Sequence, residues 1–242
     1  MTSSKSLRGR TLRLVLIGGA FASAAGCKTG PTDPGFQENL DISTCSPTAG
    51  PFSANVTNPY FPLVVGSQSR LEGQENRVPV RLQLTVLTPT EVVAGVTTRV
   101  LEERHTENGQ LAEVSRNFFA QTADGTVCYF GEDVDVYENG VIVSHPGQWR
   151  AGVGGAIPGI FMPASPEAGM SFRQEVAPGV AEDRVVIAAT NESVTVPFGT
   201  FSATVRFLET TPLEPGVQST KVYARTVGLI VDDVARLTSR TP

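Results

Sequence analysis

Apolar and polar residues alternate along several segments of this chain, which is the pattern of a β-strand with one buried face. In residues 80–86 (VRLQLTV) the even positions are apolar and the odd positions are polar. Residues 201–207 (FSATVRF) repeat the pattern, with apolar residues at the odd positions. No window of twelve residues carries the apolar stripe of an amphipathic helix. We therefore predict strands throughout the folded part of the chain.

Tight turns separate these strands. Asn108-Gly109 and Asn139-Gly140 are dipeptides typical of two-residue hairpins, and Asp124-Gly125 is a third turn signal between them. Strands joined in this way pair with their sequence neighbours, and long strands favour one curved sheet over a compact two-layer sandwich. The prediction is an all-β fold, a single antiparallel, strongly curved sheet or open barrel of about ten strands.

Residues 146–169 interrupt this pattern, because they are rich in Gly and Pro and yet contain Trp149 and Phe161. We expect neither a regular strand nor a helix here, but a packed connection that closes one side or end of the sheet. In the alternative, Trp149, Phe161 and the nearby His145 contact a ligand or a protein partner, since exposed apolar patches of this size usually mark such contacts.

The amino terminus has the pattern of a secretory signal peptide, which we place at residues 1–26. Lys5, Arg8, Arg10 and Arg13 precede a short apolar run at residues 14–25. A helix of twelve residues rises about 18 Å, too little to cross a bilayer core of about 30 Å.

The apolar run ends at Ala24-Ala25-Gly26-Cys27, which resembles the lipobox of bacterial lipoproteins. Ala24 departs from that pattern, in which a larger aliphatic residue is usual. The resemblance implies cleavage before Cys27 and acyl chains on its thiol and new amino group. Such chains hold a protein on a membrane, at about 0.8 kcal/mol per buried CH₂. The alternative is an ordinary cleavage site and a soluble secreted product. We expect a location on the extracytoplasmic side of the cell envelope, at the outer membrane if the host has one.

Residues 27–57 are predicted to be the lipidated cysteine and a flexible tether, because they are rich in Pro, Gly, Ser and Thr without apolar periodicity. Residues 58–242 form the predicted β domain. Cys45 and Cys128 are the two other cysteines. In an oxidising compartment they favour one disulfide, which would pin the second half of the tether to the domain. The alternative is two unpaired, buried thiols.

The charge of the chain excludes one class of partner. The predicted mature protein keeps 15 Lys and Arg (19 minus the four of the signal peptide) against 24 Asp and Glu, a formal charge of −9. Such a surface repels nucleic acid, so we expect no nucleic-acid partner.

Nine segments of the chain, in order, carry a further resemblance. They are NPYFPL (58–63), FAQ (119–121), YFGED (129–133), PGIFMPASPEAG (158–169), QE (174–175), GVAED (179–183), VTVPFGTF (194–201), TPLEPG (211–216) and KVYA (221–224). Together they resemble a family of bacterial exported proteins and lipoproteins that has no assigned activity. The resemblance implies a single domain from about residue 59 to 242 and transfers no catalytic residue. Cys128 departs from it, because an aromatic residue is expected there.

Histidine chemistry has little support in this sequence. A Ser or Cys nucleophile needs a base, and His105 and His145 are the two histidines of the chain. We expect His105 to be exposed at a charged strand end. His145 precedes the turn into the apolar segment. The motifs of serine hydrolases and zinc proteases, G-x-S-x-G and H-E-x-x-H, are missing, and we expect no cofactor.

Acidic clusters are the stronger chemical candidates. Glu132, Asp133 and Asp135 lie within four positions of each other beside the Asn139-Gly140 turn. Carboxylates so grouped are ligands for hard cations such as calcium, whereas the alternative is a solvated group of charges. The pairs Glu182-Asp183 and Asp232-Asp233 have weaker claims to the same role.

Three functions from different classes follow from these observations. The first is a non-enzymatic envelope lipoprotein that binds a protein or acts as a scaffold. The second is a carrier of an apolar, lipid-like ligand inside the curved sheet. The third is a hydrolase, which would need His145 beside an acid and a hydroxyl in a cleft. Whether the concave face of the sheet is filled or hollow separates the first two.

Overall fold

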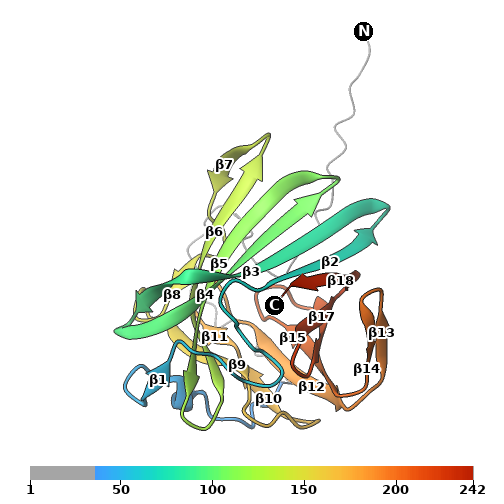
Figure 1. The fold of residues 1–242 in the computed structure, drawn as a ribbon. Coiled ribbons are helices and arrows are strands. Elements are labelled where there is room, and N and C mark those ends of the chain that lie inside the picture. The colour runs from blue at the N-terminus through green and yellow to red at the C-terminus, as the bar shows by residue number, and fades with distance from the viewer. Residues whose placement is uncertain (1–35, 242) are drawn as a thin grey trace.

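The computed structural model describes residues 36–241, so the predicted signal peptide and Cys27 lie outside the described residues. This part of the chain is built almost wholly of strands and has no α-helix (Figure 1). The elements are one 3₁₀ turn, η1 (Ile42–Cys45), and the strands β1 (Phe52–Ser53), β2 (Gln68–Glu75), β3 (Val78–Val93), β4 (Val96–Glu107), β5 (Gln110–Thr122), β6 (Val127–Glu138), β7 (Val141–Ser144), β8 (Trp149–Arg150), β9 (Ile157–Met162), β10 (Ser171–Arg173), β11 (Glu175–Val176), β12 (Arg184–Thr190), β13 (Val194–Val196), β14 (Gly199–Phe201), β15 (Thr204–Thr210), β16 (Gln218–Ala224), β17 (Gly228–Asp232) and β18 (Ala235–Thr241).

Sixteen of these strands form one antiparallel sheet, and β13 and β14 form a separate hairpin. The main path runs β10-β12-β15-β16-β17-β18-β2-β3-β4-β5-β6-β9-β11, mostly between sequence neighbours. The predicted all-β, antiparallel and strongly curved sheet is therefore confirmed. The predicted number of about ten strands is too low. The additional strands, such as β1, β8 and β11, have only two residues and show no alternation that sequence reasoning can detect.

The sheet is nearly closed into a barrel, because its two end strands are consecutive in the chain. Only Gln174 separates β10 from β11, and its backbone N–H donates to the carbonyl of Asp183 at 2.9 Å. A Cβ atom at Gly159 on β9 would lie 2.3 Å from the carbonyl oxygen of Arg173 and 2.6 Å from that of Gln174. Since no side chain fits there, glycine permits the close approach of backbones at which the barrel closes.

The predicted hairpin turns are confirmed. Asn108-Gly109 joins β4 to β5 and Asn139-Gly140 joins β6 to β7, and all four residues have positive φ angles. Asn and Gly adopt this conformation at the least cost, which is why these dipeptides fix the register of the long strands. The tips of β2–β3, β4–β5 and β6–β7 extend beyond the closed part of the barrel, at the top of Figure 1.

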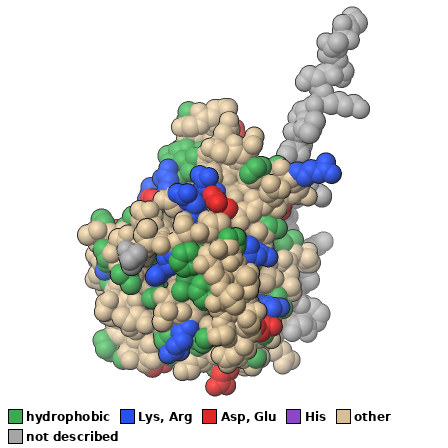
Figure 2. Space-filling view, turned by 45° about the vertical axis from the view of Figure 1, so that its right-hand side comes forward, with side chains coloured by type: hydrophobic (Ala, Val, Ile, Leu, Met, Phe, Trp, Pro, Cys, Tyr) green, Lys and Arg blue, Asp and Glu red, His purple; other side chains and the backbone are tan. Residues whose placement is uncertain are grey.

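Alternation along the strands separates the interior from the exterior. On β3, Leu82 and Leu84 are buried, whereas Arg81 points outward and forms an ion pair with Glu72 at 2.9 Å. On the face shown in Figure 2, hydrophobic side chains lie in small groups among polar and charged ones. The apolar side chains that drive folding are thus gathered inside the barrel.

The segment 146–169 is more regular than predicted. It contains β8, which pairs with β6, and β9, which pairs with both β6 and β11. The prediction that no strand forms here is wrong, because β9 forms with Pro158 and Gly159 inside it: Pro158 is opposite Glu175 on β11, and Gly159 is opposite Tyr129 on β6. Trp149 is buried and Phe161 packs against the core, so this segment is packed onto the sheet.

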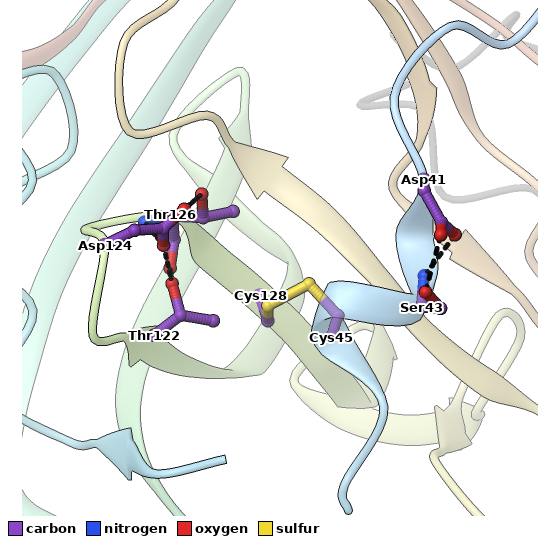
Figure 3. The surroundings of a disulfide bond; sticks show 7 residues. All are labelled: Asp41, Ser43, Cys45, Thr122, Asp124, Thr126 and Cys128. Carbon is purple, nitrogen blue, oxygen red and sulfur yellow. Dashed lines mark hydrogen bonds between the residues drawn. A yellow bond between two sulfur atoms is a disulfide. The ribbon is translucent and has the colours of Figure 1, made fainter. Parts of the chain in front are cut away.

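Residues 36–57, predicted as the second half of a tether, lie against the barrel. Cys45 and Cys128 form a disulfide across 83 positions of sequence, and both residues are fully buried (Figure 3). The Asp41 carboxylate accepts hydrogen bonds from the backbone N–H of Ser43 at 2.8 Å and from its hydroxyl at 2.7 Å. This cap fixes the turn η1 that carries Cys45 to β6.

Candidate functional site

The barrel interior contains a cavity of about 70 Å³, which is room for a few water molecules or a small organic molecule. Its lining consists of an apolar set and a polar set of residues, here called its apolar side and its polar side. The apolar lining consists of Phe61, Leu84, Leu101, Phe119, Tyr129, Trp149, Phe161, Ala181, Tyr223 and Leu229. The polar lining consists of Glu103, Asn117, Glu132, Gln174, Glu175, Asp183, Lys221 and Asp232, with the backbone of Gly147.

The apolar side is a cluster of rings in mutual contact. Phe61 lies 5.0 Å from Phe119 and 4.5 Å from Phe161, measured between ring centroids. Tyr129 stacks on Phe119 at 4.9 Å and meets Trp149 edge-on at 5.2 Å. Such contacts add about 0.5–1.5 kcal/mol for each pair beyond the burial of area. These rings fill their half of the interior with one another.

The polar side is assembled from charged residues at inward-facing positions of separate strands. Glu103 on β4 is opposite Leu84 on β3, and Glu132 on β6 is opposite Asn117 on β5. Lys221 on β16 is opposite Asp232 on β17. Strand pairing therefore brings together carboxylates that are up to about 130 positions apart in sequence.

Lys221 is the cation of the cavity lining and is already paired. Its Nζ lies 2.9 Å from Oε2 of Glu209, whose side chain is almost fully buried. Burial alone would lower the pKa of Lys221, but Glu209 and Asp232 outweigh it and hold the pKa well above its usual value. The amine therefore stays protonated near neutral pH and is not available as a nucleophile.

Burial raises the pKa values of the carboxyl groups that line the cavity. It raises the pKa of Glu103 to about 7, with Lys221 opposing and Asp232 and Glu209 adding to the effect. It also raises the pKa of Asp183 to about 7, where Glu209 adds and Lys221 opposes. The pKa of Asp232 rises to about 6 by burial, which Lys221 again opposes. These groups exchange protons near neutral pH.

Two deeper carboxyl groups are raised further. Burial and the nearby Glu113 and Glu103 raise the pKa of Glu132 well above its usual value. Burial and Asp183 do the same to Glu175, although its Oε1 accepts a 2.7 Å hydrogen bond from the backbone N–H of Asp183. Both groups therefore hold their protons more tightly than exposed carboxylates do.

One hydrogen-bonded chain ties the two sides of the cavity together. The Tyr129 hydroxyl donates to Oδ1 of Asn117, and Nδ2 of Asn117 donates to the Ser115 hydroxyl at 3.1 Å. All three residues are buried. This chain fixes the position of Asn117 beside Glu132.

Other buried polar atoms at the cavity have no hydrogen-bond partner within residues 36–241. They are Nε1 of Trp149, Nε2 of Gln174 and Oδ1 of Asp183. Trp149 is 5% exposed and Gln174 is 4% exposed, so bulk water does not cover either side chain. Buried donors without partners are rare in native proteins and call for a bound molecule or ordered water. At this cavity, two donors and an acceptor are free to bind one.

The predicted metal cluster of Glu132, Asp133 and Asp135 does not come together. Alternation along β6 points Glu132 into the barrel and Asp133 and Asp135 to its outer face. There Asp133 pairs with Arg150 at 2.6 Å, and Asp135 lies 3.3 Å from Arg116. Within residues 36–241, no group of three or more His, Cys, Asp or Glu side chains is placed to hold a metal ion.

The histidines lie outside the cavity lining. His145 is exposed, and its Nδ1 lies 3.1 Å from Asp135 and 2.7 Å from the carbonyl oxygen of Val134. His105, predicted to be exposed, is buried because it is opposite Leu82 on the inner face of the sheet. Burial lowers the pKa of His105, which favours its neutral form.

Sequence reasoning found part of this site. Trp149 and Phe161 were singled out and line the cavity, as does Glu132, whose predicted role differed. Glu103, Glu175 and Lys221 were missed. The signal that could have found Glu103 is its spacing of two from Leu101, which gives a charged residue the inward register of a strand.

Comparisons of this chain with family models, with curated proteins and with solved structures give no match. Within residues 36–241, no helix is long and apolar enough to span a membrane.

Proposed function

We propose that this chain is an exported protein, anchored to the outer side of a cell membrane by lipid on Cys27, whose barrel binds a small hydrophilic ligand. The observation that carries the binding proposal is the pair of buried donors without partners, Nε1 of Trp149 and Nε2 of Gln174, on two residues that line the cavity. A buried polar group left unpaired costs about 1–3 kcal/mol. A ligand with acceptor atoms would remove that cost.

The size of the cavity favours a small ligand over an acyl chain. Pockets for drug-sized or lipid-like molecules commonly measure about 300–1,000 Å³, whereas this one measures about 70 Å³. Phe61, Phe119 and Phe161 occupy the space in which an apolar ligand would lie. We therefore favour binding of a polar molecule over carriage of a lipid.

Hydrolysis is not favoured by the same geometry. The exposed imidazole of His145 lies beside Asp135 on the outer surface, away from the cavity lining. Lys221 is held protonated by Glu209. The cavity thus offers acids but lacks the neutral base beside a hydroxyl that acyl transfer requires.

A contact with another envelope protein is a second candidate, carried by β7. Val141, Ile142 and Val143 are three consecutive exposed apolar residues at the tip of a projecting hairpin. Replacing Val141 and Val143 by Thr keeps the β-branched shape and lowers hydrophobicity. If β7 is a partner contact, this variant should lose a complex that the native protein shows on size separation of mild membrane extracts. An unchanged complex would contradict this candidate.

The anchoring proposal is tested by Cys27→Ser. This variant should move the protein from the membrane fraction to the soluble fraction, because the thiol that carries the acyl chains is gone. Cys45→Ser is the matched control and should leave the protein on the membrane. Membrane attachment and normal processing of Cys27→Ser would overturn the anchoring proposal.

The binding proposal is tested by the thermal unfolding of the purified full-length protein with a panel of small sugars, polyols, amino alcohols and amino acids. A compound at ten times its Kd stabilises the folded state by about 1.4 kcal/mol. Trp149→Phe keeps a ring and removes the indole N–H, so the stabilisation should shrink in that variant. The absence of any stabilising compound across the panel would overturn the proposal.

A further inference from the structure

We propose that the ligand of this cavity is a small ammonium compound that also carries a hydroxyl or carbonyl oxygen, such as an amino alcohol. This inference rests on the proposed binding function and names the chemical class of the ligand. Four features of the cavity support it: its charge, its aromatic rings, its unpartnered donors and its size.

The carboxyl groups of the cavity suit a cationic ligand. Five carboxyl groups line it, from Glu103, Glu132, Glu175, Asp183 and Asp232. The single ammonium of the lining, that of Lys221, is engaged at 2.9 Å by Glu209. Carboxyl groups gathered in this way repel one another when ionised, and an added positive charge relieves that repulsion.

The aromatic rings suit an organic cation. Tyr129, Trp149, Phe119 and Phe161 line the same cavity as the carboxyl groups, and Trp149 is the cross-strand partner of Glu132. Ring faces attract ammonium groups, and cages of aromatic rings with a nearby carboxylate are a common way to bind amines. Because no group of three or more potential metal ligands forms within residues 36–241, an organic ammonium fits better than a metal ion.

The unpartnered donors require more than an ammonium group. An ammonium has hydrogen-bond donors only, so it can satisfy Oδ1 of Asp183 but neither Nε1 of Trp149 nor Nε2 of Gln174. A hydroxyl or carbonyl oxygen in the same molecule supplies the acceptor. The volume of about 70 Å³ restricts the ligand to a few heavy atoms.

Proton exchange accompanies this mode of binding. Titratable groups face the cavity or its carboxyl groups from every part of the wall. They are Glu103 and His105 on β4, Glu113 on β5, Tyr129 and Glu132 on β6, Glu175 on β11, Asp183 before β12, Glu209 on β15, Lys221 and Tyr223 on β16, Asp232 on β17 and Asp233 after it. The pKa values of Glu103 and Asp183, raised to about 7 by burial, mean that these groups are largely protonated at pH 5.5. Affinity for an ammonium ligand should therefore increase from pH 5.5 to pH 8, with release of protons on binding.

Calorimetric titration of the full-length protein in detergent tests the inference with three matched probes. Ethanolamine carries an ammonium and a hydroxyl, ethylamine lacks the hydroxyl, and ethylene glycol lacks the charge. We expect ethanolamine to bind most tightly and ethylene glycol most weakly. Glu103→Gln removes a charge from the cavity and should weaken ethanolamine binding about tenfold, the scale of one hydrogen bond to a charged group.

Glu102→Gln is the matched control, because Glu102 is adjacent on β4 but points outward to Arg116 at 3.5 Å. This variant should bind ethanolamine as the native protein does. Equal binding of ethylene glycol and ethanolamine, or unchanged affinity in Glu103→Gln with a native unfolding temperature, would overturn the ammonium inference. In those cases a neutral ligand from the panel whose binding depends on Trp149 would leave the proposed function standing. If neither the probes nor the panel bind, and water alone occupies the cavity, both proposals fail.

Discussion

The aromatic and the charged residues of the barrel interior, here called its aromatic half and its polar half, differ in what their burial does to stability. On one side, Phe61, Phe119 and Phe161 pack ring against ring with centroids 4.5–5.0 Å apart. On the other side, carboxyl groups such as Glu132 and Glu175 are buried at a cost that raises their pKa values well above the usual range. The packed rings stabilise the fold, whereas the buried carboxyl groups destabilise it, and both are carried by a single sheet.

This contrast teaches where to look for function. A barrel of this size could be filled with apolar side chains throughout, as its aromatic half is. Natural proteins depart from such consistency mainly at functional sites, where groups are held ready for a ligand. Gln174, whose Nε2 has no partner, lies between β10 and β11. The residue at which the barrel closes therefore also supplies a free donor to the cavity.

The largest expected effect is on the aromatic half. Phe119→Ala should lower the free energy of unfolding by about 4 kcal/mol, because it leaves a cavity among fully packed rings. Phe161→Ala should cost less, since Phe161 is only half-buried, whereas Phe119 is fully buried. Urea denaturation measures both. Phe198→Ala is the control, because Phe198 is exposed, and it should change stability by less than about 0.5 kcal/mol. Equal losses of unfolding free energy in the three variants would contradict the claim that the packed rings stabilise the fold.

The next effect concerns the ion pair of the polar half. Lys221→Met should destabilise the protein by about 3 kcal/mol at pH 7, since removing one partner leaves the buried carboxylate of Glu209 uncompensated. The double variant Lys221→Met with Glu209→Gln should recover most of that loss, because no unpaired charge remains. Chemical denaturation of the single and double variants gives the comparison. A double variant as unstable as the single one would show that Lys221 stabilises the protein through its packing rather than through its charge.

The strands and hairpins were largely predictable from the sequence, and the polar half of the cavity was not. Alternation at residues 80–86 and the Asn-Gly turns predict strands and hairpins, because both signals are local. The charged half depends on which strands are opposite each other, and pairing such as that of Lys221 with Asp232 appears only once register is fixed. Glu132 shows the limit best. Its neighbours Asp133 and Asp135 suggested one cluster, but strand alternation places Glu132 on the opposite face from both.

The pH dependence of stability separates the two halves without any substitution. The carboxyl pKa values in the folded state lie near 7 for Glu103, Glu113 and Asp183 and near 6 for Asp232, mainly because of burial, against usual values near 4. Between those limits the folded state binds more protons than the unfolded state, so stability should fall as pH rises from 5 to 8. We expect a loss of about 2–3 kcal/mol, since one pKa unit corresponds to about 1.4 kcal/mol and solvent at the cavity reduces the sum.

Urea denaturation at pH 5, 6, 7 and 8 measures this slope. Glu103→Gln should flatten it, because the variant has one fewer group to titrate, whereas Phe119→Ala should lower the whole curve without changing its shape. Stability that is constant or increasing over this range would mean that the polar half is better solvated than its burial indicates.

The smallest expected effect comes from removing the hydroxyl of Tyr129, a residue that contacts both the aromatic and the polar half. Its ring stacks on Phe119 at 4.9 Å, while its hydroxyl donates to Asn117 on the polar side. Tyr129→Phe keeps the ring and leaves Oδ1 of Asn117 without this donor, so it should cost about 1 kcal/mol. Tyr129→Ala also removes the ring and should cost about 4 kcal/mol. The difference between the two variants, measured by urea denaturation, gives the share of each half in holding Tyr129 in place. Since Asn117 lines the cavity beside Glu132, Tyr129→Phe should also weaken binding of a ligand there by more than its small effect on stability suggests. Equal losses of stability in the two variants would mean that the hydrogen-bonded chain, and not the stacked rings, fixes Tyr129 in place.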